Sequence, residues 1–264
     1  MSDRPHESGG QAEGTLISHL LELRDRLLRA VIAIVILAVP CLFYANELFT
    51  LVAEPLLQQL PKGATMIATS VVAPFMAPFK LALVCAVFLA MPYVLYQVWA
   101  FVAPGLYRHE RRFALPLLIS SVLLFYVGVV FAYLIVFPLM FTFFTNTTPA
   151  GVQMMTDITQ YLDFVLVLFF CFGIAFEIPV ATVLLVWTGL VGIEALTRNR
   201  GYVILGIFII AAILTPPDAV SQTAMAVPMY ILYEGGIVMA RILLKAKLAA
   251  RAREASEEEK EASA

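Results

Sequence analysis

One acidic residue stands inside an apolar stretch of the chain, where a carboxylate is chemically conspicuous. Glu177 lies between Phe176 and Ile178, in a run from residue 164 to residue 193 that is otherwise uncharged. A carboxylate in such surroundings is costly and therefore predicts a functional site. The alternative is a protonated glutamate that hydrogen-bonds a neighbouring helix. Pro179 lacks a backbone donor and predicts a kink in the helix beside the acid.

Two further acids lie next to arginines. Glu22 and Arg26 are four residues apart, within residues 15–29, whose leucines recur at helical spacing. Glu110 is a lone acid in a basic stretch that also holds Arg108, Arg111 and Arg112. Such acids either form ordinary surface ion pairs, worth about a few tenths of a kcal/mol each, or receive a cation from outside the chain. The residues alone leave both interpretations open.

A proline-rich turn near the end of the chain carries a third group of polar residues. Its sequence is LTPPDAVSQT, residues 214–223, in which Asp218 can cap the helix that follows. Thr215 and Gln222 place polar groups at a membrane edge, where they can bond another helix. A simpler interpretation is a hairpin turn without further function. The three cysteines and three histidines are dispersed along the chain, so we expect no disulfide framework, no metal site and no cofactor.

The elements that must position these residues are membrane-spanning helices. The chain is 61% hydrophobic and 14% charged, with a mean hydropathy of +0.90, whereas soluble domains are about half apolar and a quarter charged. A net charge of −2 does not indicate a nucleic-acid partner. The apolar windows lack the alternation of barrel strands, which leaves helices. The windows are Ala30–Asn46, Leu81–Tyr107, Phe113–Thr145, Phe164–Ile193, Gly201–Pro217 and Ala219–Tyr233.

These windows predict an all-α integral membrane protein with six transmembrane helices. A span needs about 20 apolar residues, so we expect the last two helices to be short. Residues 1–14 are expected to form a flexible N-terminus, residues 15–242 the membrane domain, and residues 243–264 a charged tail whose glutamates indicate disorder. The loop of residues 47–72 is predicted to contain a short interfacial helix before Pro61.

The basic residues predict the orientation of the spans. Lys and Arg cluster in loops on the cytoplasmic side, and here the basic loops alternate along the chain. Both termini are therefore predicted to be cytoplasmic. The basic residues of this side are Arg24, Arg26, Arg29, Arg108, Arg111, Arg112, Arg198, Arg200, Arg241, Lys245, Lys247, Arg251 and Arg253.

Four stretches together resemble the large subunit of the twin-arginine protein translocase, the TatC family. They are HLLELRDRLL (19–28), KLALVCAVFLAMPYVLYQVWAFVAPGLYRHERR (80–112), FGIAFEIPV (172–180) and LTPPDAVSQT (214–223). The resemblance implies a glove-shaped, six-helix signal-peptide receptor in the bacterial inner membrane. Such receptors work with small single-span subunits, and several copies of the receptor are expected within one complex. They export folded proteins across the cytoplasmic membrane with the proton-motive force.

The resemblance also implies roles for individual residues. Glu22 and Glu110 match the acids that receive the two arginines of a signal peptide, and Phe101 matches an aromatic residue of the same patch. Glu177 matches the residue that engages a partner helix, and Thr215 and Gln222 are assigned to the same contact. Pro55 and Asp218 match exterior positions tied to assembly or activity. Further cations expected in the signal-peptide site are Arg24, Arg108, Arg111 and Arg112.

Three other classes of protein are compatible with some of these features. A proton-coupled small-molecule transporter should show several ionisable residues at mid-membrane and an internal repeat, but the sequence shows one clear acid and no repeat. An intramembrane hydrolase needs a nucleophile with a base, and Ser120 and Ser121 have no histidine within a span. A passive assembly scaffold is the third alternative. Copurification without signal-peptide binding would favour the scaffold. The resemblance favours a receptor, and we do not expect an enzyme.

Overall fold

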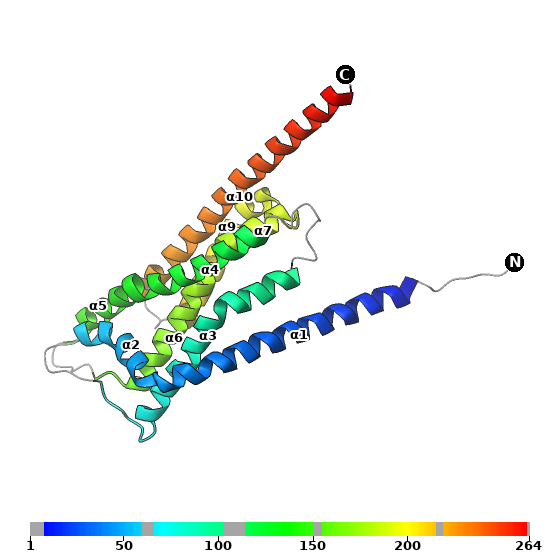
Figure 1. Ribbon diagram of the computed structural model, residues 1–264. Helices are drawn as coiled ribbons and strands as arrows, with labels where there is room; N and C mark the ends of the chain where they lie inside the picture. Colours follow the sequence, from blue (N-terminus) through cyan, green and yellow to red (C-terminus); the bar gives the residue numbers. More distant parts are fainter. Residues whose placement is uncertain (1–7, 60–65, 103–113, 150–154, 215–218, 263–264) are drawn as a thin grey trace. The chain divides into compact units, whose positions relative to one another are not determined.

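The computed structural model describes residues 8–59, 66–102, 114–149, 155–214 and 219–262, and these residues form helices joined by short connections (Figure 1). The one β-type pairing among them is an isolated parallel bridge between Ile67 and Asp157. The helices are α1 Ser8–Phe43, α2 Ala45–Gln59, α3 Ala73–Val102, α4 Ala114–Phe131, the π-helical turn η3 Ala132–Val136, α5 Phe137–Thr147, α6 Ile158–Ala175, α7 Ile178–Trp187, α8 Ile193–Arg198, α9 Arg200–Leu214 and α10 Ala219–Ala262. The predicted all-α class is confirmed for this part of the chain.

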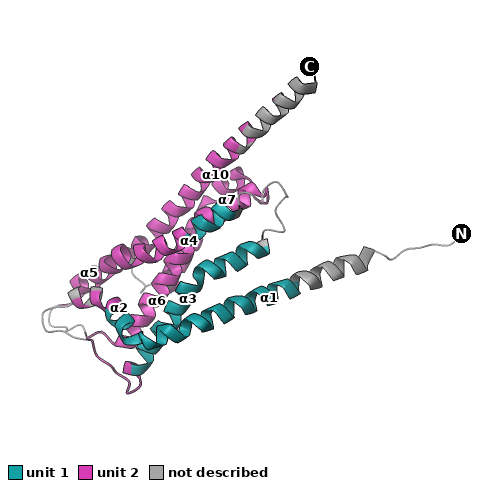
Figure 2. Ribbon diagram, in the orientation of Figure 1, with its two compact units in different colours: residues 1–50, 75–122 teal, residues 51–74, 123–264 magenta. Residues whose placement is uncertain are grey.

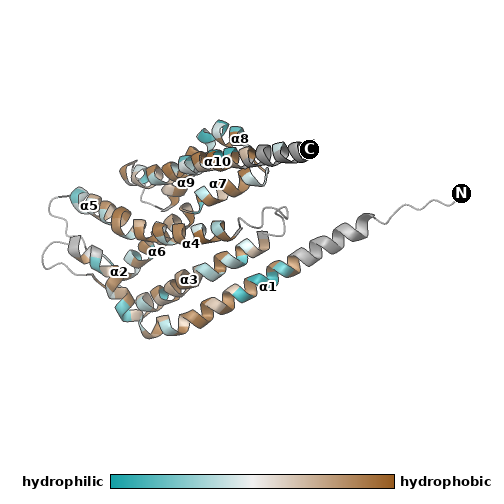
Figure 3. Cartoon of the chain, turned by 45° about the horizontal axis from the view of Figure 1, so that its top comes forward, coloured by the Kyte–Doolittle hydropathy of each residue, from teal (hydrophilic) through white to brown (hydrophobic). Residues whose placement is uncertain are grey.

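Five helical segments of the described chain are long and apolar enough to cross a membrane. Hydrophobic residues, brown in Figure 3, dominate these segments. They cover residues 20–43, 73–101, 115–147, 158–187 and 222–246, and residues 200–213 form a shorter apolar helix. Because α9 has 15 residues, it is only about 22 Å long, below the roughly 30 Å of a hydrocarbon core. The predicted shortness of the fifth helix is confirmed.

The sixth helix is not short, and this part of the prediction was wrong. Its candidate span, residues 222–246, has 25 residues. The predicted window ended at Tyr233 because the next residue, Glu234, is charged. In the structure Glu234 forms an ion pair with Arg200. A carboxylate paired in this way can lie within an apolar helix, and the helix continues past it. α10 then runs on to Ala262, through the segment expected to be disordered. Alanine, arginine, lysine and glutamate are strong helix formers, and they make up much of this segment.

Prolines interrupt two of the spans. The third span runs through α4, η3 and α5, and the π-helical turn immediately precedes Pro138. The fourth span breaks between α6 and α7, where Phe176 and Glu177 form a turn and Pro179 lies in the first turn of α7. Proline lacks an N–H and its ring clashes with the preceding turn. The kink predicted beside Glu177 is confirmed.

At the first helix and the first loop, the structure refines the expected boundaries. α1 begins at Ser8, ahead of Thr15, so the helix includes residues expected to be flexible. α2 ends at Gln59, which confirms the helix predicted before Pro61.

The chain divides into two compact units, coloured separately in Figure 2. The first contains residues 1–50 and 75–122, and its core joins α1 to α3 through small side chains. Ala38 and Cys41 of α1 pack with Ala82 and Ala86 of α3, each of them buried. Small residues let membrane helices approach closely. The cysteines of the chain are free thiols.

The second unit contains residues 51–74 and 123–264. α10 packs against α7 and α9. Two glycines mark places where helices touch backbone to backbone: a Cβ on Gly128 would lie 2.5 Å from the carbonyl oxygen of Phe172, and one on Gly236 would lie 2.9 Å from the Cα of Pro179. The helices around the Glu177 bend are therefore tightly packed.

Candidate functional site

The polar part of α1 carries the first candidate site. Glu22 Oε1 accepts hydrogen bonds from Arg26 Nε at 3.0 Å and from Arg26 Nη2 at 2.5 Å. Arg26 Nη1 in turn donates to Gln97 Oε1 on α3 at 3.5 Å. The Glu22 side chain is 37% exposed and that of Arg26 21% exposed. The pair predicted from the spacing is confirmed, and the contact with Gln97 fixes where the arginine points.

This part of α1 forms an open hollow with both signs of charge. Its lining residues are Leu21, Glu22, Asp25, Arg26 and Arg29. Arg24 pairs with its neighbour Asp25 at 2.9 Å, and both side chains are largely exposed. Exposed pairs of this kind contribute only about 0.2–1 kcal/mol each. The Arg24–Asp25 pair is therefore weak, whereas Glu22 accepts two hydrogen bonds from the less exposed Arg26.

The end of α3 that contacts Arg26 is hydrogen-bonded to α4. Gln97 is 5% exposed, and Phe101 lies four residues further on, half-buried on the same side of the helix. The buried indole of Trp99 donates from Nε1 to Ser121 Oγ of α4 at 3.2 Å, which ties α3 to the beginning of α4. The hydroxyl of Ser120 donates to the carbonyl of Leu117 at 2.8 Å. Both serines considered as nucleophiles are thus engaged in structural hydrogen bonds.

Several predicted site residues lie outside the described residues. They are Glu110, Arg108, Arg111, Arg112, Thr215 and Asp218, together with the side chain of Pro55. The meeting of Glu22 with Glu110 stays a prediction. Gln222 is described, and it lies half-buried in the first turn of α10.

Glu177 is positioned by the break in the fourth span. It takes the N-cap position of α7 without capping through its side chain, its N–H donates to the carbonyl of Ile174 at 3.0 Å, and its carbonyl accepts from Ala181 at 2.9 Å. Its side chain is partly buried. Phe131 packs against both Phe172 and Phe176, with ring centroids 5.7 and 5.5 Å apart. Glu177 thus lies where the backbone turns, directly after one of these packed phenylalanines.

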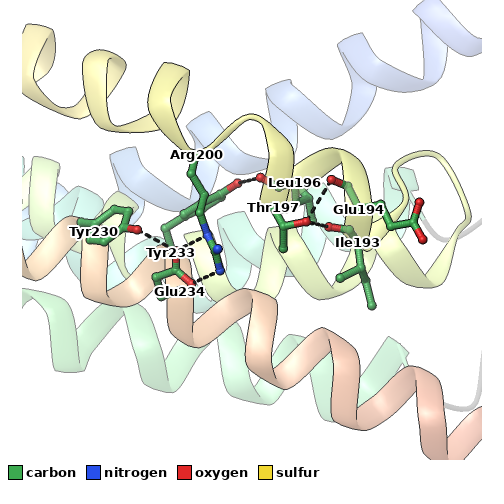
Figure 4. A network of polar contacts seen from close by, with 8 residues as sticks. All are labelled: Ile193, Glu194, Leu196, Thr197, Arg200, Tyr230, Tyr233 and Glu234. Atoms are coloured by element: carbon green, nitrogen blue, oxygen red, sulfur yellow. Dashed lines mark hydrogen bonds and ion pairs between the residues drawn. The ribbon is translucent and has the colours of Figure 1, made fainter.

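Another acid within a span was missed by the sequence analysis. Figure 4 shows Glu234 of α10 bound to Arg200 at the start of α9. Arg200 Nη2 donates to Glu234 Oε2 at 2.8 Å, and Arg200 Nε lies 2.6 Å from Glu234 Oε1. Tyr230 Oη donates to Oε1 of the same carboxylate at 2.8 Å, and Tyr233 Oη donates to the carbonyl of Leu196 at 2.9 Å. The network joins α8, α9 and α10, so it has a structural role.

A junction between the start of α6 and the segment before α3 was also missed. Asp157 caps α6: its Oδ1 accepts from the N–H groups of Thr159 at 2.9 Å and Gln160 at 3.2 Å. Its Oδ2 accepts from Thr69 Oγ1 at 2.6 Å and Thr69 N at 2.9 Å. The Thr69 hydroxyl bond, then the Thr69 amide and the helix N–H groups, lower the pKa of Asp157 to about 2 against the opposing effect of burial. An Asp after a loop and before an apolar run was the available sequence signal.

The fold and these sites define the class of protein: a multi-pass helical membrane protein with an open charged hollow at its first span and a carboxylate at a bend in its fourth. Among the described residues, no group of three or more His, Cys, Asp or Glu is arranged to hold a metal ion.

Comparison with known proteins gives the family. Residues 18–228 match the family described as Sec-independent protein translocase protein (TatC). Curated relatives of that name from Azotobacter chroococcum mcd 1 and Escherichia coli strain K12 are 59% and 53% identical, over 84% and 86% of this chain and 87% and 88% of theirs. A solved structure of a twin-arginine translocase receptor, TatC, superposes with a TM-score of 0.77 at 37% identity and covers 85% of this chain and 98% of that one. The chain belongs to the TatC family. It is a membrane-spanning subunit of a protein translocase, a transport protein rather than a catalytic enzyme.

Proposed function

We propose that this chain is the signal-peptide receptor and core subunit of the twin-arginine translocase. It exports folded proteins across the bacterial cytoplasmic membrane with the proton-motive force. The observation that carries the proposal is the Glu22 carboxylate, which lies in an open hollow at the polar part of the first span. The matching residues of the TatC family support this assignment.

Glu22 has capacity for a further cation. Both hydrogen bonds from Arg26 reach Oε1, and no described residue bonds Oε2. A carboxylate accepts several hydrogen bonds, and the planar guanidinium fork matches it in two-point geometry. An arginine of a signal peptide can therefore bind Oε2 beside Arg26 or displace Arg26 from Oε1.

The energies favour exchange at this site. The Arg26–Glu22 pair has helical i,i+4 spacing and is partly exposed, so it stabilises the free receptor by only about 0.3–0.5 kcal/mol. Net hydrogen bonds to charged groups reach about 1.5–3 kcal/mol. Arg26 Nη1 already contacts Gln97 Oε1, so the guanidinium can keep this acceptor when it leaves Glu22. We propose that Glu110 supplies the second carboxylate, with Phe101 beside it, and that the cations Arg24, Arg108, Arg111 and Arg112 shape the same patch.

The other predicted residues are proposed to have roles within the same translocase. Glu177, Thr215 and Gln222 contact the membrane helix of a small single-span subunit, and Pro55 and Asp218 act in assembly or activity on the exterior side. Several copies of the chain assemble in the complex. Both termini lie in the cytoplasm. Six spans forming a glove-shaped bundle are the arrangement that this proposal requires.

A proton-coupled small-molecule transporter is the second function considered, and it is less favoured. Glu234, one of the acids described within the spans, is paired with Arg200 and Tyr230. A proton relay needs a series of groups that can each gain and lose a proton. Glu234 paired with Arg200 and Tyr230 does not form such a series.

Site-specific crosslinking tests the receptor role. A photoreactive amino acid is placed at Leu21, which lines the hollow, and a control is placed at Val35, further along α1 and also exposed. The Leu21 probe should capture a precursor with consecutive arginines and release it when the arginines are replaced by lysines. The Val35 probe should not distinguish the two precursors. Equal capture of both precursors at Leu21 would reject the site.

A further inference from the structure

The exterior helix α2 contains a proline in its interior. Pro55 is preceded by ten and followed by four residues of the helix Ala45–Gln59. In an α-helix the N–H of residue 55 would donate to the carbonyl of Leu51. Proline has no N–H, so the Leu51 carbonyl has no donor from its own helix. A carbonyl that lacks its helical donor can accept a hydrogen bond from another group.

A tyrosine from another span supplies the missing donor. Tyr133 Oη, from η3, donates to the Leu51 carbonyl at 3.0 Å. The Tyr133 ring packs against Phe169 of α6, with centroids 6.3 Å apart. The hydroxyl therefore comes from a side chain held by its own packing. Tyr133, Leu51 and Phe169 belong to the same compact unit.

A second tyrosine contacts the adjacent carbonyl of α2. Tyr161 Oη of α6 donates to the carbonyl of Val52 at 2.7 Å. The Tyr161 side chain is 2% exposed, and its ring is wedged against Phe137 and Phe141 with centroids 5.6 and 5.7 Å away. The N–H of Leu56, four residues after Val52, is the regular helical donor to the Val52 carbonyl. Because a carbonyl can accept two hydrogen bonds, Tyr161 and Leu56 can both donate to it. The Tyr161 contact thus does not depend on the proline.

We infer that Pro55 acts through the hydrogen-bond acceptor that it frees. Because Pro55 cannot donate to the Leu51 carbonyl, this carbonyl can accept the hydrogen bond from Tyr133. That bond attaches the exterior helix α2 to the third span. Tyr133 is a positioning residue for α2, and Tyr161 reinforces it one carbonyl further on. Val52 and Ala53, next to Leu51 in α2, are 6% and 3% exposed, so this part of α2 is buried in the fold. The inference goes beyond the receptor role and does not rest on it.

A double-mutant cycle on the full chain in detergent tests the inference. Tyr133→Phe is made with Pro55 present and in the Pro55→Ala background, where the restored backbone N–H pairs with the Leu51 carbonyl. Amide hydrogen exchange of residues 45–59 is measured in each. With Pro55 present, the loss of one hydrogen bond should speed the exchange of α2 on the order of fivefold. In the Pro55→Ala background, the same change should speed exchange by less than about twofold, since the carbonyl keeps a partner.

Tyr161→Phe is the matched control, and it should speed exchange by the same factor in both backgrounds. The inference is overturned if Tyr133→Phe has an equal effect in the two backgrounds, because the hydroxyl would then act elsewhere. It is also overturned if Tyr133→Phe leaves exchange unchanged with Pro55 present. Binding of an Arg-Arg signal peptide, measured on Tyr133→Phe and Tyr161→Phe with Pro55 present, should stay at the wild-type level. A failure of the receptor proposal would thus be seen separately.

Discussion

At the scale of single residues, Glu177 combines a carboxylate with a break in the span that carries it. The chain turns at Phe176 and Glu177, and the Glu177 side chain is partly buried. Hydrogen bonds between membrane helices contribute about 1–2 kcal/mol in model peptides. One such bond to a partner helix would make Glu177 important for association without making it essential for folding.

Glu177→Ala should therefore weaken crosslinking to the single-span subunit on the order of tenfold, while signal-peptide binding persists. Glu177→Gln keeps hydrogen-bonding groups at the same place and should retain most of the contact. The measurement is crosslinking yield, with thermal unfolding followed in parallel. Unchanged crosslinking together with a lower unfolding temperature would assign Glu177 a purely structural role.

Asp157 predicts a pH dependence of stability at the junction that it forms with Thr69. Its pKa is lowered to about 2, below the ordinary value of about 3.9. A depressed pKa means that the stabilisation is fully present above the ordinary value and disappears as the pH falls toward 2. The difference in unfolding temperature between wild type and Asp157→Asn should therefore shrink as the pH is lowered from about 4 to about 2. A difference that stays constant over this range would show that the charge of Asp157 contributes nothing.

Contacts between residues close together in the sequence could be predicted from helical spacing and from proline. Glu22 with Arg26 follows from helical periodicity, and the kink beside Glu177 follows from Pro179. The pairs Arg200–Glu234 and Thr69–Asp157 join residues 34 and 88 positions apart. No local pattern contains such contacts, because they depend on which helices fold back on one another.

At the scale of elements, close helix packing depends on glycine at defined positions. A Cβ added to Gly128 of α4 would meet the backbone carbonyl of Phe172 at 2.5 Å, whereas one added to Gly206 of α9 would meet nothing within 4 Å. A backbone oxygen cannot turn aside as a flexible side chain can. The contact between α4 and α6 therefore requires glycine.

Gly128→Ala should destabilise the folded protein by about 1–3 kcal/mol, as overpacking typically does. Gly206→Ala is the control, and it should be neutral or slightly stabilising because alanine is the better helix former. Thermal unfolding in detergent compares the two. Equal stability of both variants would mean that α4 and α6 are not in the described contact.

The lengths of the helices could be predicted only where charged residues mark the helix ends. The short α9 was expected from the length of its charge-free window. The length of α10 was not, because the window was ended at Glu234, whereas the structure pairs Glu234 with Arg200 and Tyr230 and the helix continues. The helical tail to Ala262 reflects high intrinsic propensity, which outweighs the disorder that a run of glutamates suggests.

At the scale of the whole molecule, the alternating basic loops predict the orientation of the chain. Reporter domains fused after Arg112, Arg200 or Arg253 should be cytoplasmic, and those fused at Lys62 or Gly151 should be exterior, because translocating Lys and Arg is unfavourable. Protease accessibility in sealed vesicles provides an independent measurement. An exterior reporter after Arg112 or Arg200 would contradict the six-span arrangement, and with it the placement of Glu22 and Glu110 on one side.

The central claim is that Glu22 and Glu110 together recognise paired arginines. Two carboxylates held at fixed positions can distinguish two guanidinium forks from two ammonium groups, whereas a diffuse acidic surface responds only to total charge. Loss of either acid should cost on the order of tenfold to a hundredfold in affinity, with solvent exposure at Glu22 favouring the lower figure. Asp25 lies in the same hollow but pairs with Arg24, so Asp25→Ala is the matched control.

The most direct measurement is the affinity of an Arg-Arg signal peptide and of its Lys-Lys version for wild type, Glu22→Ala, Glu110→Ala and Asp25→Ala. Wild type and Asp25→Ala should prefer Arg-Arg strongly, and the two glutamate variants should each lose most of that preference. If Glu22→Ala and Glu110→Ala discriminate between the peptides as well as wild type does, these acids are structural charges and recognition takes place elsewhere on the protein.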